Sequence, residues 1–203
     1  MNFLAHIYLS GDNNAIKIGN FIADSIKGKK YQGYPLGIQQ GIVLHRQIDS
    51  FTDVHPIVKV SKNRLHKRYR HYDGVIIDIL YDHYLAKNWA SYSDIPLSTY
   101  VQNFYTLLKD NYNILPKKIQ LMLPIMIKGN WLYSYKTTKG IEKVLQGMNK
   151  RTKNISQMHL AIEDLTLHYS DLENDFIEFF EKLRTFCDEK LQAYNHKNST
   201  NHS

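Results

Sequence analysis

Apolar side chains recur at intervals of three and four residues over most of the chain, the spacing that gathers them on one face of an α-helix. The longest such stretch covers residues 156–194 and predicts a single long amphipathic helix. No segment shows the sustained alternation of apolar and polar residues that is typical of a strand. The pattern therefore predicts an all-α fold.

Glycine, proline and polar residues divide this pattern into separate helices. Further helices are expected over 14–27, 35–52, 58–90, 98–111 and 141–150, and one begins at Pro116. The segment 58–90 is expected to break at 72–74, and Pro124 should kink or divide the helix that contains it. The polar run 195–203 is expected to be disordered. Residues 1–194 should then form one helical domain.

The composition is that of an ordinary globular protein, with 43% hydrophobic and 22% charged residues, which excludes a disordered chain. The single cysteine, Cys187, excludes an intramolecular disulfide, and we interpret it as a buried structural thiol in a reducing compartment. No apolar run approaches the ~18 residues that cross a bilayer, and the N-terminal residues do not resemble a signal peptide. These features predict a soluble, cytoplasmic protein without membrane insertion.

The net charge of +7 is compatible with three kinds of partner: nucleic acid, an anionic membrane surface, or an acidic protein or phosphate-bearing substrate. Three lysines, Lys27, Lys29 and Lys30, form one cationic group. A second group has no intervening acid and consists of Lys59, Lys62, Arg64, Lys67, Arg68 and Arg70. A solvated helix face would explain either group. The second exceeds what solubility needs, so we favour a docking role for it.

Histidines and aspartates interrupt apolar sequence at several places in the first half of the chain. Asp24 is the only acid on an otherwise apolar helix. Residues four apart share a helix face, with Cβ atoms about 5–6 Å apart. His45 and Asp49 are therefore one same-face pair, and Asp78 and Asp82 are another. Carboxylates that face a core cost free energy unless they are paired, protonated or bound to a cation.

A divalent cation held between two such helices would stabilise several of these carboxylates at once. Imidazole and carboxylate donors without thiolates favour Mn, Mg or Fe over structural zinc. His6, which lies in the apolar opening of the chain, is a further candidate. Each residue alone has a structural explanation: Asp49 can end a helix, and Asp82 can pair with Arg46. Together they favour a metal site. The sequence lacks the glycine-rich phosphate loop, the dinucleotide fingerprint, HExxH and the G-x-S-x-G elbow.

An ordered series of motifs resembles the acyl carrier protein phosphodiesterase family. The motifs are MNFLAH at 1–6, GNFIAD at 19–24, GI at 41–42, LHR at 44–46, IDSFTD at 48–53, HP at 55–56, DI at 78–79, YDHYLA at 81–86, Trp89, GNWL at 129–132 and Tyr135. The likeness extends over roughly residues 1 to 185, and the order and length of the motifs make it specific.

The resemblance implies an enzyme that removes 4′-phosphopantetheine from holo-acyl carrier protein and returns the apo form. Members of the family are described as Mn-dependent and as distant relatives of the HD phosphohydrolases, which are helical bundles. The His-Asp pair of that superfamily occurs here only in reverse, as Asp82-His83. On this basis Mn²⁺ is the expected cofactor, with Mg²⁺ or Fe²⁺ as alternatives. The expected metal ligands are Asp24, His45, Asp78 and His6, and the expected catalytic residues are His83, Asp82 and Asp49. The group that protonates the leaving serine is left open.

Acyl carrier proteins are small and strongly acidic, so a basic surface should steer their association. Arg64, Lys67 and Arg68 are the expected contacts. Two other functions fit part of the sequence. An HD-like phosphohydrolase of nucleotides or another small phosphodiester would use the same metal site without a basic patch. A non-enzymatic nucleic-acid-binding module would use the basic surface, but its apolar-flanked acids would weaken phosphate binding. We therefore expect an acidic protein partner and no nucleic acid.

Overall fold

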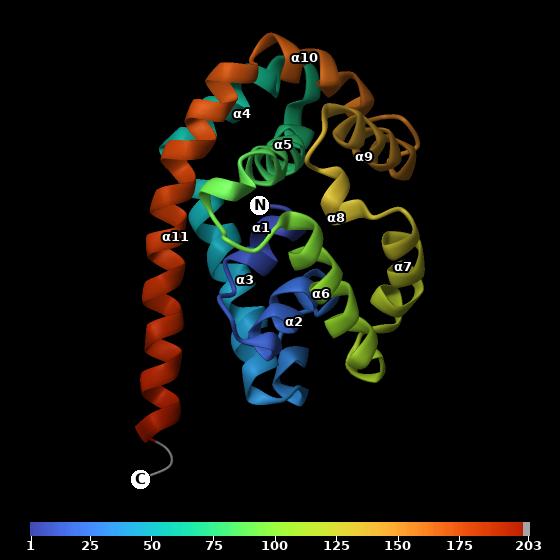
Figure 1. Ribbon diagram of the computed structural model, residues 1–203. Coiled ribbons are helices and arrows are strands. Elements are labelled where there is room, and N and C mark those ends of the chain that lie inside the picture. Colours follow the sequence, from blue (N-terminus) through green and yellow to red (C-terminus); the bar gives the residue numbers. More distant parts are fainter. Residues whose placement is uncertain (201–203) are drawn as a thin grey trace.

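The computed structural model describes the backbone of residues 1–200 and the side chains of residues 1–194, and it is helical along almost its whole length (Figure 1). No strand occurs in this part of the chain, which confirms the predicted all-α fold. The α-helices are α1 (Phe3–Tyr8), α2 (Asn14–Ile22), α3 (Leu36–Val54), α4 (Pro56–Tyr69), α5 (Asp73–Lys87), α6 (Leu97–Asp110), α7 (Lys117–Lys128), α8 (Trp131–Ser134), α9 (Thr138–Arg151), α10 (Ala161–Leu167) and α11 (Tyr169–Thr200). Short 3₁₀ turns join them, namely η1 (Ala23–Ser25), η2 (Lys30–Gly33), η3 (Arg70–Tyr72), η4 (Trp89–Ser91), η5 (Tyr112–Ile114) and η6 (Met158–Leu160).

Most predicted helices are present, but several of their boundaries differ from the prediction. The expected break near 72–74 is confirmed by η3, which separates α4 from α5. The single helix predicted over 156–194 is wrong, because the chain turns at His168 between α10 and α11. The apolar spacing continues through this turn since Leu165 and Leu172 are both buried in the same core. Helix α2 ends at Ile22, and η1 continues it to Ser25.

Helix α11 extends to Thr200, so the polar run predicted to be disordered begins inside the helix. Residues 201–203 lie outside the described residues, and disorder of this segment stays a prediction. No helix in the described part of the chain combines the length and the apolar character that a membrane span requires.

Helix α11 runs along one side of the molecule and covers α3, α4 and α5 (Figure 1). Its inner face buries aromatic rings, among them Phe176 and Phe180, which stack with centroids 4.9 Å apart. Buried tyrosines keep hydrogen-bond partners for their hydroxyls, as Tyr81 does with Ser61 at 2.8 Å. This side of the core supports the helices that carry the candidate site.

Helices α2 and α3 pack with their backbones almost in contact, because glycines face each other at the crossing. A Cβ atom at Gly19 would lie 2.1 Å from the carbonyl oxygen of Ile38. A Cβ atom at Gly41 would lie 2.2 Å from the carbonyl oxygen of Ile16. Any side chain at either position would force the helices apart. The close approach brings η1, which follows α2, against the middle of α3.

A carboxylate on α5 holds the N-terminus of α1 in place. Asp82 accepts hydrogen bonds from the backbone N–H groups of Leu4 (2.7 Å), Ala5 (3.2 Å) and Asn2 (3.3 Å). These are unpaired donors at a helix start, and Asp82 caps them from a residue far away in sequence. Burial raises the pKa of Asp82 to about 7, although the N–H bonds from Leu4 and Ala5 act in the opposite direction. Asp82 thereby fixes the helix that carries His6.

Replacing Asp82 with alanine should destabilise the protein by about 2–3 kcal/mol, because three N–H groups at the start of α1, two of them in buried hydrogen bonds, lose their acceptor. Asp82→Asn should cost less, since the amide oxygen still accepts. Urea denaturation measures both values. Asp110→Ala, an exposed position at the end of α6, serves as the control and should change the free energy of unfolding by less than ~0.5 kcal/mol. Equal stabilities for Asp82→Ala and Asp110→Ala would contradict the capping role.

Candidate metal centre

Four ionisable side chains from three separate elements meet beside α3. His45 Nε2 lies 3.1 Å from Asp49 Oδ2, so the two residues share a helix face as predicted. The same nitrogen lies 3.1 Å from Asp24 Oδ1 on η1. His6 Nε2, from α1, lies 3.2 Å from Asp49 Oδ1. The rings of His6 and His45 stack with centroids 4.0 Å apart. One donor atom from each of His6, His45 and Asp49 lies within 4.8 Å of the others, a spacing that one metal ion can bridge.

A cavity of about 210 Å³ opens at this cluster. It is lined by Met1, Asp24, His45, Asp49, Thr52, Asp53 and Asp78. Four of these residues are aspartates, and among the side chains that the structure describes no lysine or arginine lines the cavity. Two of the aspartates have compensating charges: the α-amino group of Met1 donates to Asp78 at 2.8 Å, and Lys62 donates to Asp53 at 3.1 Å. The cavity therefore favours cations over anions.

The two imidazoles have opposite protonation preferences. Burial and the neighbouring charge of His45 lower the pKa of His6 to about 4. Burial also lowers the pKa of His45, but the hydrogen bonds to Asp24 and Asp49 outweigh it and raise that pKa to about 9. Burial raises the pKa of Asp49, but the hydrogen bonds from both histidines outweigh burial, so the pKa of Asp49 is lowered. The hydrogen bond from His45 also lowers the pKa of Asp24. In the cluster without metal, His45 is therefore a protonated imidazolium, and His6 is neutral.

Asn20, which is fully buried on α2, determines how the His45 ring is oriented. Its Nδ2 donates to the carbonyl oxygen of His6 at 2.9 Å and to Ser10 Oγ at 3.0 Å. Its Oδ1 therefore faces His45 Nδ1, 3.2 Å away, and accepts a hydrogen bond from it. This fixes the proton on Nδ1 and directs Nε2 toward the carboxylates, as an outer hydrogen bond does for a ligating histidine. The sequence analysis missed Asn20, although an amide inside the apolar GNFIAD motif is a signal for such a role.

Thr52 is a second residue that the sequence analysis missed. Its side chain lines the cavity, yet only 2% of the residue is exposed to solvent. Its Oγ1 is buried and has no hydrogen-bond partner in the described part of the chain. Buried hydroxyls are nearly always hydrogen-bonded, so a free one beside a cluster of acids is a candidate contact for a bound molecule. Thr52 lies within the IDSFTD motif, and a threonine between two carboxylates gives no signal of its own in the sequence.

The other predicted site residues occupy different positions. Asp78 lines the cavity and pairs with the α-amino group of Met1. Asp82 caps α1, and neither Asp82 nor His83 lines the cavity. His83 lies 2.7 Å from the carbonyl oxygen of Tyr135 through Nδ1 and 2.8 Å from the Tyr169 hydroxyl through Nε2. The ligand role of Asp78 and the catalytic roles of Asp82 and His83 stay predictions, and the contacts of Asp82 and His83 are those of structural residues.

Two of the three predicted substrate-binding cations are engaged within the protein. Arg64 forms an ion pair with Asp175 of α11. Arg68 lies 3.0 Å from Glu163 and 3.3 Å from Asp164. Lys67 is exposed and forms no ion pair with a residue that the structure describes. Their role in binding a partner stays a prediction.

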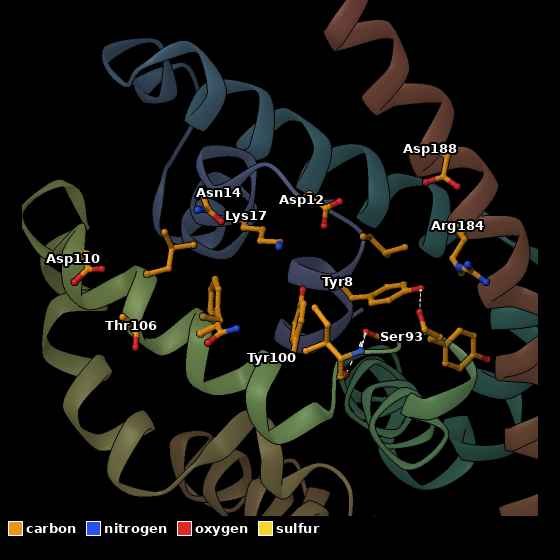
Figure 2. A pocket seen from close by; sticks show the side chains of 17 residues that line it. Tyr8, Asp12, Asn14, Lys17, Ser93, Tyr100, Thr106, Asp110, Arg184 and Asp188 are labelled. Atoms are coloured by element: carbon orange, nitrogen blue, oxygen red, sulfur yellow. Dashed lines mark hydrogen bonds between the residues drawn. The ribbon is translucent and has the colours of Figure 1, made fainter.

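A second, larger cavity of about 660 Å³ lies between α6, α11 and the segment 8–17 (Figure 2). Its polar side chains are spread around a broad hollow and do not converge on one point (Figure 2). Lys17 lies 5.4 Å from the centre of the Tyr100 ring, and Arg184 donates to Glu181 at 3.0 Å. The two cavities share no lining residue. The convergence of imidazoles and carboxylates distinguishes the smaller cavity as the candidate site.

The fold and this site define a class: a helical protein with a centre of imidazoles and carboxylates suited to a divalent cation. The model of the family described as "Acyl carrier protein phosphodiesterase" matches residues 1–183, and the chain belongs to that family. This confirms the resemblance found in the sequence. No solved structure matches the chain.

Curated relatives with the name "Acyl carrier protein phosphodiesterase" match over most of their length. The protein of Photorhabdus laumondii is 30% identical over 184 residues, which cover 89% of this chain and 91% of the relative. The protein of Enterobacter sp. (strain 638) is also 30% identical over 184 residues, covering 90% and 95%. The protein of Yersinia enterocolitica is 29% identical over 191 residues, covering 94% and 99%.

The electrostatics of the cluster predict the titration of His45 in metal-free protein. Its pKa should be about 9, raised from 6.5 because Asp24 and Asp49 stabilise the imidazolium. A raised pKa in the folded state contributes stability that is fully present below pH 6.5 and is lost as the pH rises through 9. NMR of the imidazole nitrogens in the presence of a chelator measures the pKa, and Asp49→Asn should lower it. A midpoint near 6.5 in the unmodified protein would contradict this arrangement.

Proposed function

We propose that this protein hydrolyses the phosphodiester that links 4′-phosphopantetheine to the serine of holo-acyl carrier protein, and that it does so with a bound divalent metal, Mn²⁺ or alternatively Mg²⁺ or Fe²⁺. Membership of the family and the names of its relatives support the substrate. The observation that carries the proposal is the cluster of His6, His45 and Asp49 with the adjacent Asp24, of which His45, Asp24 and Asp49 line one acidic cavity.

The residues of the cavity fit a divalent metal by their charge and their donor chemistry. A phosphodiester is an anion, and a cavity lined by four aspartates repels it unless a cation is present. His6, His45 and Asp49 would hold the metal, with Asp24 as an adjacent carboxylate. Nitrogen and oxygen donors without thiolate match Mn²⁺ or Fe²⁺, and the carboxylates also suit Mg²⁺. Such an ion supplies charge neutralisation at phosphoryl oxygens and lowers the pKa of a water molecule.

The protein's own side chains would position the reactants. His45 must release its proton before Nε2 can act as a ligand, and Asn20 keeps the other ring nitrogen protonated throughout. Asp24, whose side chain is 68% exposed, lies at the opening of the cavity and is the carboxylate placed to accept a proton from the attacking water. Thr52 Oγ1 would donate a hydrogen bond to a phosphoryl oxygen.

The reaction is balanced as a simple hydrolysis. The oxygen of water forms a bond to phosphorus, and the bond from phosphorus to the serine oxygen breaks. One proton of the water ends on the serine oxygen, and the other remains with the released phosphomonoester or with solvent. The products are apo-acyl carrier protein and 4′-phosphopantetheine.

The direct test is intact-mass spectrometry of holo-acyl carrier protein incubated with this protein and Mn²⁺. The mass should fall by one 4′-phosphopantetheine group, and a chelator should prevent the change. A parallel panel of nucleotides should remain intact. If nucleotides are hydrolysed and the carrier protein stays unchanged in Mn²⁺, Mg²⁺ and Fe²⁺, the protein is a nucleotide phosphohydrolase and the proposal is wrong.

His45→Ala and Asp49→Ala should each lower kcat/KM by at least ~100-fold, because each removes a donor that holds the metal. Isothermal titration with Mn²⁺ should show weakened binding in both variants. Asp94→Ala, at an exposed aspartate outside the cavity, is the matched control and should keep both values. If the two site variants bind Mn²⁺ and turn over as the control does, the cluster is not the centre.

Thr52→Val replaces the free hydroxyl with a methyl group of similar size. It should lower kcat by ~10–100-fold, equivalent to a lost hydrogen bond to a charged oxygen in the transition state. Thr52→Ser restores the hydroxyl and should recover most of the rate, while Mn²⁺ affinity stays the same in both variants. Identical kcat values for Thr52→Val and the unmodified protein would exclude a contact with the substrate.

A further inference from the structure

Three of the six cations of the cluster at 59–70, which was favoured for docking, are compensated by nearby acids, while Lys59, Lys67 and Arg70 form no ion pair with a residue that the structure describes. Lys62 is paired with Asp53, Arg64 with Asp175, and Arg68 with Glu163 and Asp164. Paired cations attract a further acidic partner weakly, because the approaching carboxylates must compete with those already bound. A docking surface for an acidic protein is better sought where cations are exposed and unpaired.

Residues 27–36, which we name the lysine loop, meet this requirement. The loop carries Lys27, Lys29 and Lys30, all of them exposed, and none forms an ion pair with any residue that the structure describes. The chain contains no acidic residue between Asp24 and Asp49, so no acid nearby in sequence offsets these charges. Leu36, at the end of the loop, is 57% exposed and adds an apolar contact.

The lysine loop is fastened to the helix that carries the site. Arg46 of α3 donates through Nη2 to the carbonyl oxygens of Ile26 at 3.0 Å and Gly28 at 2.8 Å. Its guanidinium also lies 5.1 Å from the centre of the Tyr31 ring. Gln39 of α3 donates to the carbonyl oxygen of Tyr34 at 2.7 Å. The loop is thereby held in place before a partner binds, which reduces the entropy lost on binding.

The position of the loop places its charge beside the cavity. Lys27 follows Asp24 by three residues, and the Asp24 carboxylate is hydrogen-bonded to His45. Arg46, which anchors the loop, is the neighbour of His45 in sequence. When a partner contacts these lysines, the partner's groups next to that contact would therefore lie at the opening of the cavity.

Helix α7 also exposes lysines and apolar side chains, but it does not lie beside the cavity. It exposes Leu121 and Ile125 beside Lys117, Lys118 and Lys128. None of its residues lines the cavity, and it lies on the opposite edge of the molecule from α3 (Figure 1). Helix α7 thus offers a control with a similar mixture of charge and apolar area.

We propose that the lysine loop is the docking surface for the acidic protein substrate, with Lys27, Lys29 and Lys30 contacting carboxylates that flank the modified serine. This inference rests on the proposed function for the identity of the partner. Opposite charges across such a surface mainly raise the association rate and set the orientation of the partner. The lysines therefore act in binding, while the chemical step depends on the cavity.

The test compares two triple charge reversals in the full-length chain with bound Mn²⁺. The variant Lys27→Glu, Lys29→Glu, Lys30→Glu should raise KM for holo-acyl carrier protein at least ~10-fold, with kcat within ~2-fold and Mn²⁺ affinity unchanged. The control Lys117→Glu, Lys118→Glu, Lys128→Glu changes the net charge equally and should leave KM within ~2-fold. An unaltered KM in the loop variant, or an equal rise in both variants, overturns the inference.

Binding of fluorescently labelled apo-acyl carrier protein separates docking from chemistry, since this protein has no phosphodiester to cleave. The loop variant should bind it at least ~10-fold more weakly than the α7 control does. If binding depends on the lysines but the holo form is not cleaved, the proposed function is refuted and the docking surface is still supported. If the holo form is cleaved and the loop variant binds apo-acyl carrier protein as tightly as the α7 control does, only the docking surface is refuted. If the loop lysines instead control binding of a short nucleic acid and apo-acyl carrier protein does not bind, the partner is wrong.

Discussion

The contact between α2 and α3 is the constraint on which the site depends. Because Gly19 and Gly41 leave no side chain between the helices, the end of α2 comes close enough for Asp24 to reach His45. The same contact buries Asn20 against α1 and α3, where it bonds both the His6 carbonyl and the His45 ring. Backbone packing and the orientation of the imidazole thus have one origin.

Charge balance is the second constraint. The cavity gathers four aspartates, and without metal three positive charges offset part of theirs, namely the His45 imidazolium, the α-amino group of Met1 and Lys62. This arrangement costs desolvation energy that apolar packing would avoid. A divalent cation at His6, His45 and Asp49 would account for such a concentration of acids in one cavity.

The sequence was sufficient for features that depend on local spacing. The helical period predicted the fold class, and the interval of four predicted that His45 and Asp49 share a face. Contacts between distant segments were not predictable in this way. Asp82 caps α1 across some 80 residues, and Arg64 meets Asp175 across 111 residues. No local pattern distinguishes such structural acids and cations from catalytic or docking ones, and the apolar spacing could not reveal the turn at His168.

The central claim is that the cluster beside α3 holds a divalent cation. Anomalous X-ray diffraction from crystals grown with Mn²⁺ tests this most directly. The account predicts one strong anomalous peak within about 2.0–2.3 Å of donor atoms of His6, His45 and Asp49. The account is contradicted if the protein cleaves holo-acyl carrier protein but its only manganese peak lies away from His6, His45 and Asp49. In that case the contact between His45 and Asp49 would be unchanged.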